Sequence, residues 1–207
     1  YKVSGQAVFS IVKATVVISA DPVPLQLTYT GATQKLISAG DATGGTLLYS
    51  LDGENYQADL PKAVDAGTYT VYYKVQGDGN HTDSEVKSVT VSIEKKACTV
   101  SGITAMDKVY DMTTAVTLGF DAVIFGGMAE GDELTVTAKG FFVDANAGKD
   151  KEVTISELTL DGTSIANYRL AAEGQQTTAK ATITEKVIDK PVIELSESSF
   201  VYDGNAK

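Results

Sequence analysis

Histidine, the side chain that acid–base and nucleophilic catalysis most often requires, occurs once in this 207-residue chain, as His81. Serine and cysteine hydrolases place an imidazole beside the nucleophile, so a single histidine excludes most schemes of that kind. His81 follows Asn80 in the same way as Tyr168 follows Asn167. We therefore predict that His81 occupies a position of the scaffold and is not a catalytic base.

Carboxylates are numerous, and a pair of them is sufficient for glycoside hydrolysis. Most of the 27 acidic residues, however, stand in turn sequences such as Asp52-Gly53, Gly131-Asp132 and Asp161-Gly162, where an Asp side chain commonly bonds the nearby backbone. We expect that the protein is not an enzyme, and we assign no catalytic residue, no cofactor-binding residue and no cofactor.

The segment from Asp78 to Glu85 has the residue types of a calcium site. Oxygen-bearing side chains stand at alternate positions from Asp78 to Ser84, and a hard cation prefers oxygen ligands. The full EF-hand spacing is absent, and the polar tip of a hairpin has the same composition. Both interpretations stay open, and we assign no metal ligand.

A saccharide site usually presents exposed aromatic rings, and the chain has ten Tyr but no Trp. Residues 68–75 alternate as a β-strand does, with Tyr69, Val71, Tyr73 and Val75 on one face. Tyr72 then points outward and is the clearest candidate for a ligand contact. The other interpretation is an ordinary cross-strand packing partner.

Two patterns recur roughly 80 to 90 residues apart, and similarity at a fixed period is typical of an array of small domains. One pattern contains a tyrosine two residues before Gly or Met: Leu27-Thr28-Tyr29-Thr30-Gly31, Lys108-Val109-Tyr110-Asp111-Met112 and Phe200-Val201-Tyr202-Asp203-Gly204. The other is an alternating strand that leads into a lysine: Phe9-Ser10-Ile11-Val12-Lys13, Val91-Ser92-Ile93-Glu94-Lys95 and Ala181-Thr182-Ile183-Thr184-Glu185-Lys186.

The order of these patterns predicts two whole units and two partial ones. The whole units are residues 14–96 and 97–188, and each is long enough for a small domain. Residues 1–13 are expected to be the C-terminal strand of a preceding repeat, and residues 189–207 the N-terminal strands of a following one. We expect two separate domain cores joined end to end. The partial units, where ordered, should pair with a neighbouring domain or another copy, and the chain should otherwise be monomeric.

The composition favours an extracellular β protein. Hydrophobic residues make up 43% of the chain and charged residues 21%, and the net charge is −10. This acidity disfavours nucleic acid and anionic membrane as partners. No run reaches the roughly 18 apolar residues that a membrane span needs. The single cysteine, Cys98, excludes an intrachain disulfide framework and is expected to be a small buried residue.

A turn and a corner further define the first unit. Asp52-Gly53-Glu54-Asn55 separates two strand-like runs, 47–51 and 56–58. Asp65-Ala66-Gly67-Thr68-Tyr69 has the spacing of the tyrosine corner of immunoglobulin-like sandwiches. In the second unit the charged run 149–152 replaces this corner. Helix should be scarce, with at most one turn between residues 165 and 175.

These motifs resemble those of bacterial surface proteins. In the first unit, Tyr49-Ser50-Leu51-Asp52-Gly53 and Ala66-Gly67-Thr68-Tyr69-Thr70-Val71 are similar to Ig-like or MBG-type repeats. In the second, Val109-Tyr110-Asp111, Asn146-Ala147-Gly148 and Ala166-Asn167-Tyr168-Arg169-Leu170 are similar to YDG-type repeats. Met112 stands where that pattern has glycine, so a turn that needs positive φ would be strained there.

The resemblance implies an all-β fold: tandem immunoglobulin-like β-sandwich domains in a linear array, with a β-grasp-like fold as the alternative for the second unit. It implies a structural stalk or spacer in a bacterial cell-surface or secreted protein, which presents a distal functional region. The alternative is an adhesin whose repeats bind host glycan or protein directly. The expected partners are neighbouring repeats of the same polypeptide.

Overall fold

The computed structural model describes residues 9–192 and residue 204. Within them the fold is all-β, and one three-residue 3-10 helix, η1 (Ile165–Asn167), is the helical element. The prediction of scarce helix, with at most one turn between residues 165 and 175, is therefore confirmed for this part of the chain. The described residues hold no helix long enough to cover a sheet, as a β-grasp fold would require.

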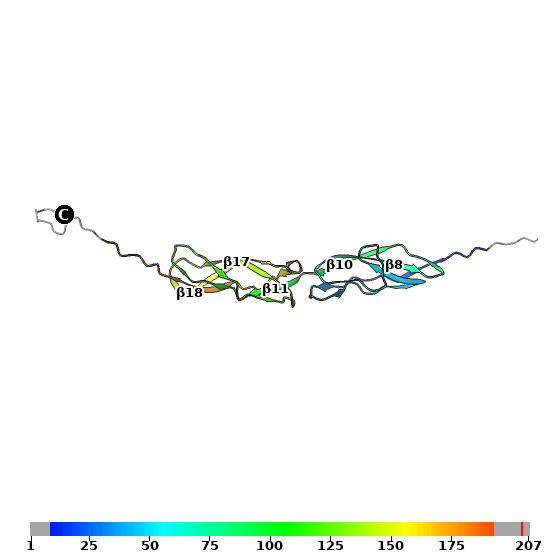
Figure 1. Ribbon diagram of the computed structural model, residues 1–207, viewed down its shortest axis with the longest axis horizontal. Coiled ribbons are helices and arrows are strands. Elements are labelled where there is room, and N and C mark those ends of the chain that lie inside the picture. Colours follow the sequence, from blue (N-terminus) through cyan, green and yellow to red (C-terminus); the bar gives the residue numbers. More distant parts are fainter. Residues whose placement is uncertain (1–8, 193–203, 205–207) are drawn as a thin grey trace, which may run out of the picture.

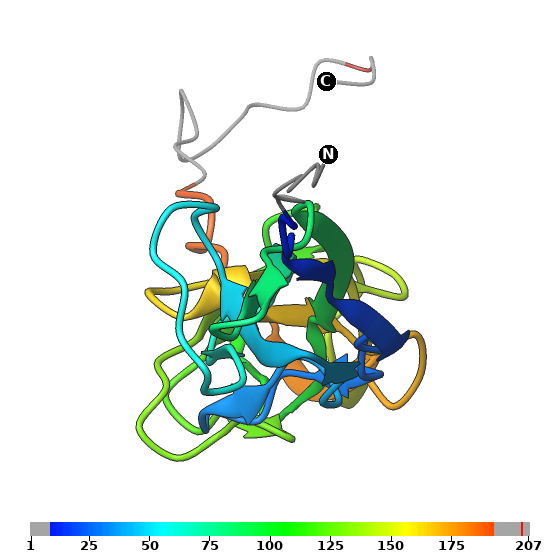
Figure 2. The ribbon, with the colours of Figure 1, turned by 90° about the vertical axis from the view of Figure 1, so that its right-hand side faces the viewer.

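The strands form two groups along the longest axis of the molecule (Figure 1). The first strand group contains β1 to β10 and the second contains β11 to β20, and every strand pair of the described residues lies within one group. Lys95 alone separates β10 from β11. Viewed along the long axis, the first group lies in front of the second (Figure 2).

The first strand group is built around a four-stranded sheet of order β3-β10-β8-β6, with the two-stranded pairs β1-β9, β2-β5 and β4-β7 beside it. Its strands are β1 (Ala14–Thr15), β2 (Val17–Ala20), β3 (Leu27–Thr28), β4 (Gln34–Lys35), β5 (Asp41–Thr43), β6 (Gly45–Ser50), β7 (Lys62–Ala63), β8 (Gly67–Gly77), β9 (His81–Thr82) and β10 (Lys87–Glu94).

The second strand group is built around a five-stranded sheet of order β13-β20-β18-β17-β14, with the sheets β16-β11-β19 and β12-β15 beside it. Its strands are β11 (Lys96–Ser101), β12 (Thr104–Ala105), β13 (Lys108–Val109), β14 (Ala115–Val116), β15 (Leu118–Gly119), β16 (Ile124–Gly126), β17 (Thr135–Phe142), β18 (Gly148–Asp161), β19 (Tyr168–Leu170) and β20 (Thr178–Thr184).

The core of the first group follows from the alternation predicted for β8. Val71, Tyr73 and Val75 are buried, while Thr70, Tyr72 and Lys74 between and beside them are half-buried. Because successive side chains of a strand point to opposite faces, the apolar set collects on one side of the sheet. The alternation of the sequence therefore identified the inner face correctly.

The cores of the two groups are continuous, which differs from the expectation of two separate cores. One buried cluster contains Tyr29 and Tyr49 of the first group together with Val136 and Tyr168 of the second. A smaller buried cluster lies within the second group alone and consists of Phe142, Val153, Ala181 and Ile183. The expectation of separate cores was wrong because apolar side chains where the two groups adjoin pack into one buried cluster.

The two recurring sequence patterns are hydrogen-bonded neighbours, and they pair in the same way in both groups. In the first group β3 runs parallel to β10, with Ile93 opposite Leu27. In the second, β13 runs parallel to β20, with Ile183 opposite Lys108. The amide that follows each short strand continues the ladder: Tyr29 N donates to Glu94 O at 2.9 Å, and Tyr110 N donates to Thr184 O at 2.8 Å.

A second pairing also occurs in both groups. β1 runs parallel to β9, with Ala14 opposite His81, and β11 runs parallel to β19, with Lys96 opposite Tyr168. His81 and Tyr168 therefore hold equivalent positions, as their sequence context predicts.

The predicted tyrosine corner is present. The hydroxyl of Tyr69 donates to the backbone oxygen of Asp65 at 2.8 Å, and Tyr69 itself is half-buried at the start of β8. In the second group the charged run 149–152 lies inside β18, where the register shifts between Gly148 and Lys151. This bulge accommodates the extra residues that replace the corner.

The Gly or Met two positions after each tyrosine of the repeated pattern has a positive φ. Gly31, Met112 and Gly204 have φ values of 82°, 67° and 84°. Met112 is therefore a non-glycine residue in the left-handed region, as the expected departure from the glycine pattern implies. The turn at Asp52-Gly53 is also present, although the two runs beside it are joined by a single bridge, Tyr49 to Gln57.

The predicted partial units lie mostly outside the described residues. Of the segment 1–13, residues 9–13 are described; they are exposed and belong to no strand. Of the segment 189–207, residues 189–192 are described as exposed and residue 204 as a bend. The described residues of these segments take part in no strand pair, and the pairing expected of the remainder falls on residues that the structure does not describe.

Candidate functional site

Polar side chains from both strand groups meet where the groups adjoin. The first group contributes Tyr29, Asp65 and the amide of Ala66, and the second contributes Asp132, Asn167 and Tyr168. We call these six residues the junction. Hydrogen bonds across the junction join residues more than 100 positions apart in the sequence. They therefore hold the two groups in a fixed relative orientation and do not stabilise a local turn.

Two tyrosines share the carboxylate of Asp132. Tyr29 Oη donates to Asp132 Oδ2 at 2.9 Å and lies 3.1 Å from Oδ1, and Tyr168 Oη donates to Oδ2 at 2.5 Å. The rings meet edge to face, with centroids 5.5 Å apart and an interplanar angle of 77°. Tyr29 is 4% exposed and Tyr168 1%. A carboxylate that accepts two buried phenol groups is a strong, directional contact.

Burial and the nearby carboxylate act on the two hydroxyls in the same direction. Desolvation first, and then the hydrogen bond to Asp132, raise the pKa of Tyr29. The same two causes raise the pKa of Tyr168 to about 12. Both side chains therefore stay neutral donors at physiological pH.

Asn167 joins the same two groups through its amide. Its Oδ1 accepts from Ala66 N at 2.8 Å, and its Nδ2 donates to Asp65 Oδ1 at 3.0 Å. It lies at the end of η1 and is 7% exposed. Asp65, which accepts from Asn167, is itself held by the tyrosine corner, because Tyr69 donates to its backbone oxygen.

The backbones also approach closely here. A Cβ built on Gly31 would lie 2.9 Å from Ala129 Cβ, and Ala129 N donates to Tyr168 Oη at 2.7 Å. Glycine at position 31 therefore meets two requirements: it adopts the positive φ of its turn, and its lack of a side chain allows close contact with the second group. In chemical terms the junction contains hydrogen-bond donors paired with acceptors, and its arrangement is suited to holding two bodies in a fixed orientation.

The segment that contributes Asp132, Asn167 and Tyr168 matches a known family. Residues 94–179 match the family model of the YDG domain. A YDG domain is found at residues 94–179. The match begins at the last residue of β10 and covers the side of the junction that the second strand group supplies.

The other comparisons add little. No curated protein matched the chain. Among solved structures, the chain is similar to the crystal structure of Drosophila N-cadherin EC1-3, with 11% sequence identity and a TM-score of 0.26 over 84% of this chain and 68% of that chain. At this TM-score the likeness supports no conclusion about fold or function.

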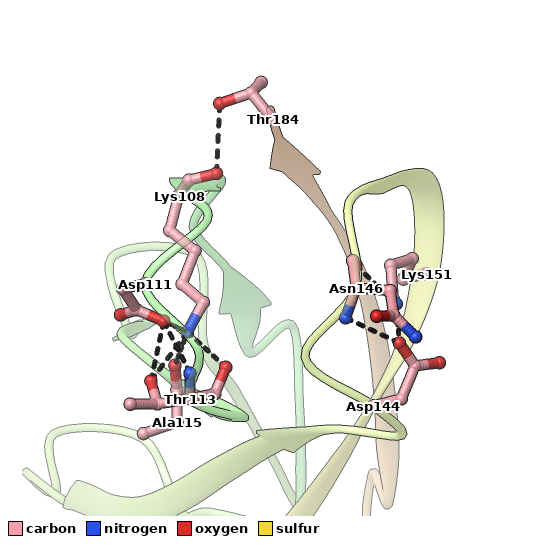
Figure 3. Close-up of polar contacts among 8 residues, drawn as sticks. All are labelled: Lys108, Asp111, Thr113, Ala115, Asp144, Asn146, Lys151 and Thr184. Atoms are coloured by element: carbon pink, nitrogen blue, oxygen red, sulfur yellow. Dashed lines mark hydrogen bonds and ion pairs between the residues drawn. The ribbon is translucent and has the colours of Figure 1, made fainter. Parts of the chain in front are cut away.

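At its far end the YDG domain carries two loops, each held by a lysine (Figure 3). Lys108 Nζ lies between 2.8 and 2.9 Å from four oxygens, which share its three N–H donors: Asp111 Oδ1, Thr113 O, Thr113 Oγ1 and Ala115 O. The hydrogen bond from Lys108, followed by those from Thr113, lowers the pKa of Asp111 to about 2. The ammonium group thus closes the turn that contains Met112.

The second loop is held in a similar way. Lys151 Nζ donates to Asp144 Oδ1 and, at 2.7 Å, to Asn146 O, and the Lys151 hydrogen bond lowers the pKa of Asp144. The two loops lie on either side of the end of β20, where Thr184 Oγ1 donates to Lys108 O (Figure 3).

The structure places His81 in the scaffold. Its Nδ1 lies 2.7 Å from Asp78 Oδ1, and its ring packs against Gly44, where a Cβ would come within 2.7 Å of His81 Cδ2. Its pairing with Ala14 matches that of Tyr168 with Lys96, as the sequence context predicts.

In the loop from Asp78 to Glu85 the carboxylates bond nearby backbone. Asp78 Oδ1 accepts from Asn80 N at 2.8 Å, and Asp83 Oδ1 accepts from Gly77 N at 2.9 Å. Within residues 9–192 and 204, no three His, Cys, Asp or Glu side chains gather in a cluster that could hold a metal ion.

Tyr72 lies on the face of β8 opposite the buried Val71 and Tyr73, as the alternation predicts, and it is half-buried. A Cβ on Gly53 would lie 3.6 Å from its ring, so the turn at Gly53 lies close to it. A role for Tyr72 in ligand contact stays a prediction. Cys98 is fully buried, as expected, and burial raises the pKa of its thiol. Of the helical residues that the structure describes, none forms a segment able to cross a membrane.

The junction is the site that the sequence did not predict. Asp132 and Asn167 were recognised as parts of a turn and of a YDG-type motif, and Tyr29 as part of a repeat. No pattern in one sequence indicates that these three residues meet, because the contact depends on how two units are oriented.

Proposed function

We propose that the chain is part of a structural stalk: two immunoglobulin-like β domains of a tandem array in a bacterial surface or secreted protein, which hold a distal functional region away from its anchor. The observation that carries this proposal is the junction. One residue separates β10 from β11. The carboxylate of Asp132 and the buried amide of Asn167, both in the YDG domain, bond Tyr29 and Ala66 of the preceding group.

A stalk has to resist bending, and the junction is suited to this. A flexible linker of several residues would allow the two domains to reorient, whereas a one-residue connection with hydrogen bonds on both sides restricts them. The net charge of −10 keeps an extended chain soluble and discourages association with similar chains.

The first test is the shape of the molecule in solution. Small-angle X-ray scattering of the full chain should give one elongated shape, and the double variant Tyr29→Ala with Asp132→Ala should give a broader distribution of distances. The variant Glu152→Ala, which removes an exposed acid in β18 far from the junction, should scatter like the natural chain. Equal scattering from all three would contradict the proposal that the junction stiffens the chain.

The second test separates the stalk from an adhesin. We expect no saturable binding of the full chain to a glycan array or to host extracellular proteins. Saturable binding at micromolar concentrations would contradict the stalk and favour repeats that bind host glycan or protein directly.

A further inference from the structure

The far end of the YDG domain has the same construction as the end of the first group that forms the junction. In the first group, Gly67 lies opposite Ile93 in the antiparallel pair of β8 with β10. In the YDG domain, Gly148 lies opposite Ile183 in the antiparallel pair of β18 with β20. The residues before these glycines, Ala66 and Ala147, therefore hold equivalent places.

The tyrosines of the two ends are equivalent as well. Tyr29 and Tyr110 each follow a short strand that runs parallel to the closing strand, and each donates its amide to that strand. A groove formed by residues 66–68 and 92–95 lies beside the junction, and its counterpart is formed by residues 147–149 and 182–185. We call Tyr110, Asn146, Ala147 and the end of β20 the end face.

The two ends differ in whether another strand group packs over the tyrosine. Tyr29 is 4% exposed because the second group lies over it, whereas Tyr110 is only half-buried. Asn146, the counterpart of Asp65, carries an amide oxygen that can accept the hydrogen bond which Asp65 accepts from Asn167. Lys108 and Lys151 hold the two loops of the end face in place (Figure 3), so little ordering is needed before a partner binds.

We propose that the end face is a docking site for a third β unit whose contact surface has the chemistry of the YDG domain's side of the junction: a carboxylate for the hydroxyl of Tyr110, and an Asn amide for the backbone N–H of Ala147. The sequence after Lys190 supports this occupant, because Tyr202-Asp203-Gly204 repeats the opening pattern of a unit and Gly204 has the matching φ of 84°. The inference rests on the proposed stalk, because it extends the same junction by one unit.

A chain with a known third unit tests the proposal. In this designed chain, a second copy of residues 97–186 is joined directly after Lys186 of residues 1–186. Lys186 then precedes the appended copy in the same way as Lys96 precedes residue 97 in the natural chain. The exposure of each tyrosine ring is measured by NMR as the relaxation enhancement caused by a soluble gadolinium chelate. Tyr29 is the internal reference, since it is already covered.

We expect the enhancement at Tyr110 to fall to the level of Tyr29 when the third unit is present. Replacing Asp132→Ala and Asn167→Ala in the appended copy alone should restore the enhancement at Tyr110, whereas Glu152→Ala in that copy, at its opposite end, should not. If the variant copy fails to fold, Tyr110→Phe in the second unit provides the test, because it removes one hydroxyl and should loosen the appended unit without changing Tyr29.

The failures of the two proposals can be distinguished in the same sample. If Tyr110 stays as accessible as in the two-unit chain while Tyr29 stays protected, the docking site is refuted and the stalk is not. If Tyr29 is itself accessible, the first junction is not formed in solution, and both proposals fail.

Discussion

The hydroxyl of Tyr29 lies 2.9 Å from Asp132 Oδ2, although 103 positions separate the two residues in the chain. This contact crosses from one strand group to the other. The same carboxylate accepts the hydroxyl of Tyr168 from within the YDG domain. Asp132 therefore connects the core of its own domain to the end of the preceding group.

The strength of this connection is measurable by a double-mutant cycle. Tyr29→Phe and Asp132→Asn should each lower the free energy of unfolding of the full chain, and their combined effect should be smaller than the sum. We expect a coupling energy of about 1 to 2 kcal/mol, as for a buried hydrogen bond to a charged group. Denaturant titrations of the four chains give the value. Additive effects would show that the two side chains do not interact in solution.

Alkaline pH should loosen the junction. Folding raises the pKa of Tyr29 and raises that of Tyr168 to about 12, from an ordinary value near 10. Below about pH 10 both rings are neutral in the folded and unfolded chain, so their contribution to stability is complete. Between about pH 10 and 12 the unfolded chain loses these protons first, and stability falls.

The measurement for this prediction is residue-resolved, because Tyr73 also has its pKa raised to about 12, by burial and by Asp21. The ¹³Cζ shift of each tyrosine should be followed by NMR from pH 8 to 12.5. Tyr168 in the variant Asp132→Asn should titrate at lower pH than in the natural chain, while Tyr73 should be unchanged. An unchanged Tyr168 would rule out Asp132 as a cause.

Replacing Met112 by glycine should stabilise the chain. Met112 has a φ of 67° and its side chain is 77% exposed, so little packing is lost, and the strain of about 1 kcal/mol for a left-handed non-glycine residue is relieved. Met106→Gly is the matched control; Met106 is also exposed but has no positive φ, and we expect it to lower the midpoint of denaturation. Destabilisation by Met112→Gly would mean that the side chain makes a contact that outweighs the strain.

Tyr69→Phe should weaken both the corner and the junction. The variant leaves the ring in place and removes the hydrogen bond to Asp65 O, which should cost about 1 kcal/mol. Because Asp65 also accepts from Asn167, hydrogen exchange of the Ala66 amide should become faster. Tyr72→Phe is the control, and we expect it to leave the Ala66 amide unchanged. If Tyr69→Phe and Tyr72→Phe changed the exchange rate of the Ala66 amide equally, the corner hydrogen bond would not support the junction.

Acid should release the turn that Lys108 holds. The pKa of Asp111 is lowered to about 2 from an ordinary value near 4. The stabilisation from this carboxylate is complete above about pH 4 and is lost as the pH falls toward 2. The amide shift of Thr113, which donates to Asp111 Oδ1, should follow this titration, and in Lys108→Met it should move to higher pH. A titration unaffected by that variant would contradict the role given to Lys108.

The sequence predicted those parts of the fold that depend on local pattern. The alternation around Val71 identified the inner face of β8, the spacing of Asp65 and Tyr69 identified the corner, and the correspondence of His81 with Tyr168 identified equivalent positions. Each of these depends on residues close in sequence or on one repeat compared with another.

The contacts that the sequence did not predict share one cause: each involves a segment distant in sequence or a loop whose path no pattern specifies. The alternation of β8 identified the face on which Tyr72 lies, but not that the turn at Gly53 lies close to its ring. Asp132 was assigned to a turn, and it does stand in one, yet its carboxylate also accepts hydrogen bonds from two tyrosines, one in each strand group. Lys108 was recognised only as part of the repeated tyrosine pattern, since nothing in its spacing indicates that four oxygens surround its ammonium group.

We expect the junction to hold the two strand groups as one body in solution. Residual dipolar couplings of backbone amides, measured on the full chain in a dilute aligned medium, test it most directly. Residues 14–94 and 96–184 should share a single alignment tensor, and Asp132→Ala combined with Tyr29→Ala should split it into two. Two different tensors in the natural chain would show that the groups reorient independently across Lys95, and the junction would then not hold them as one body.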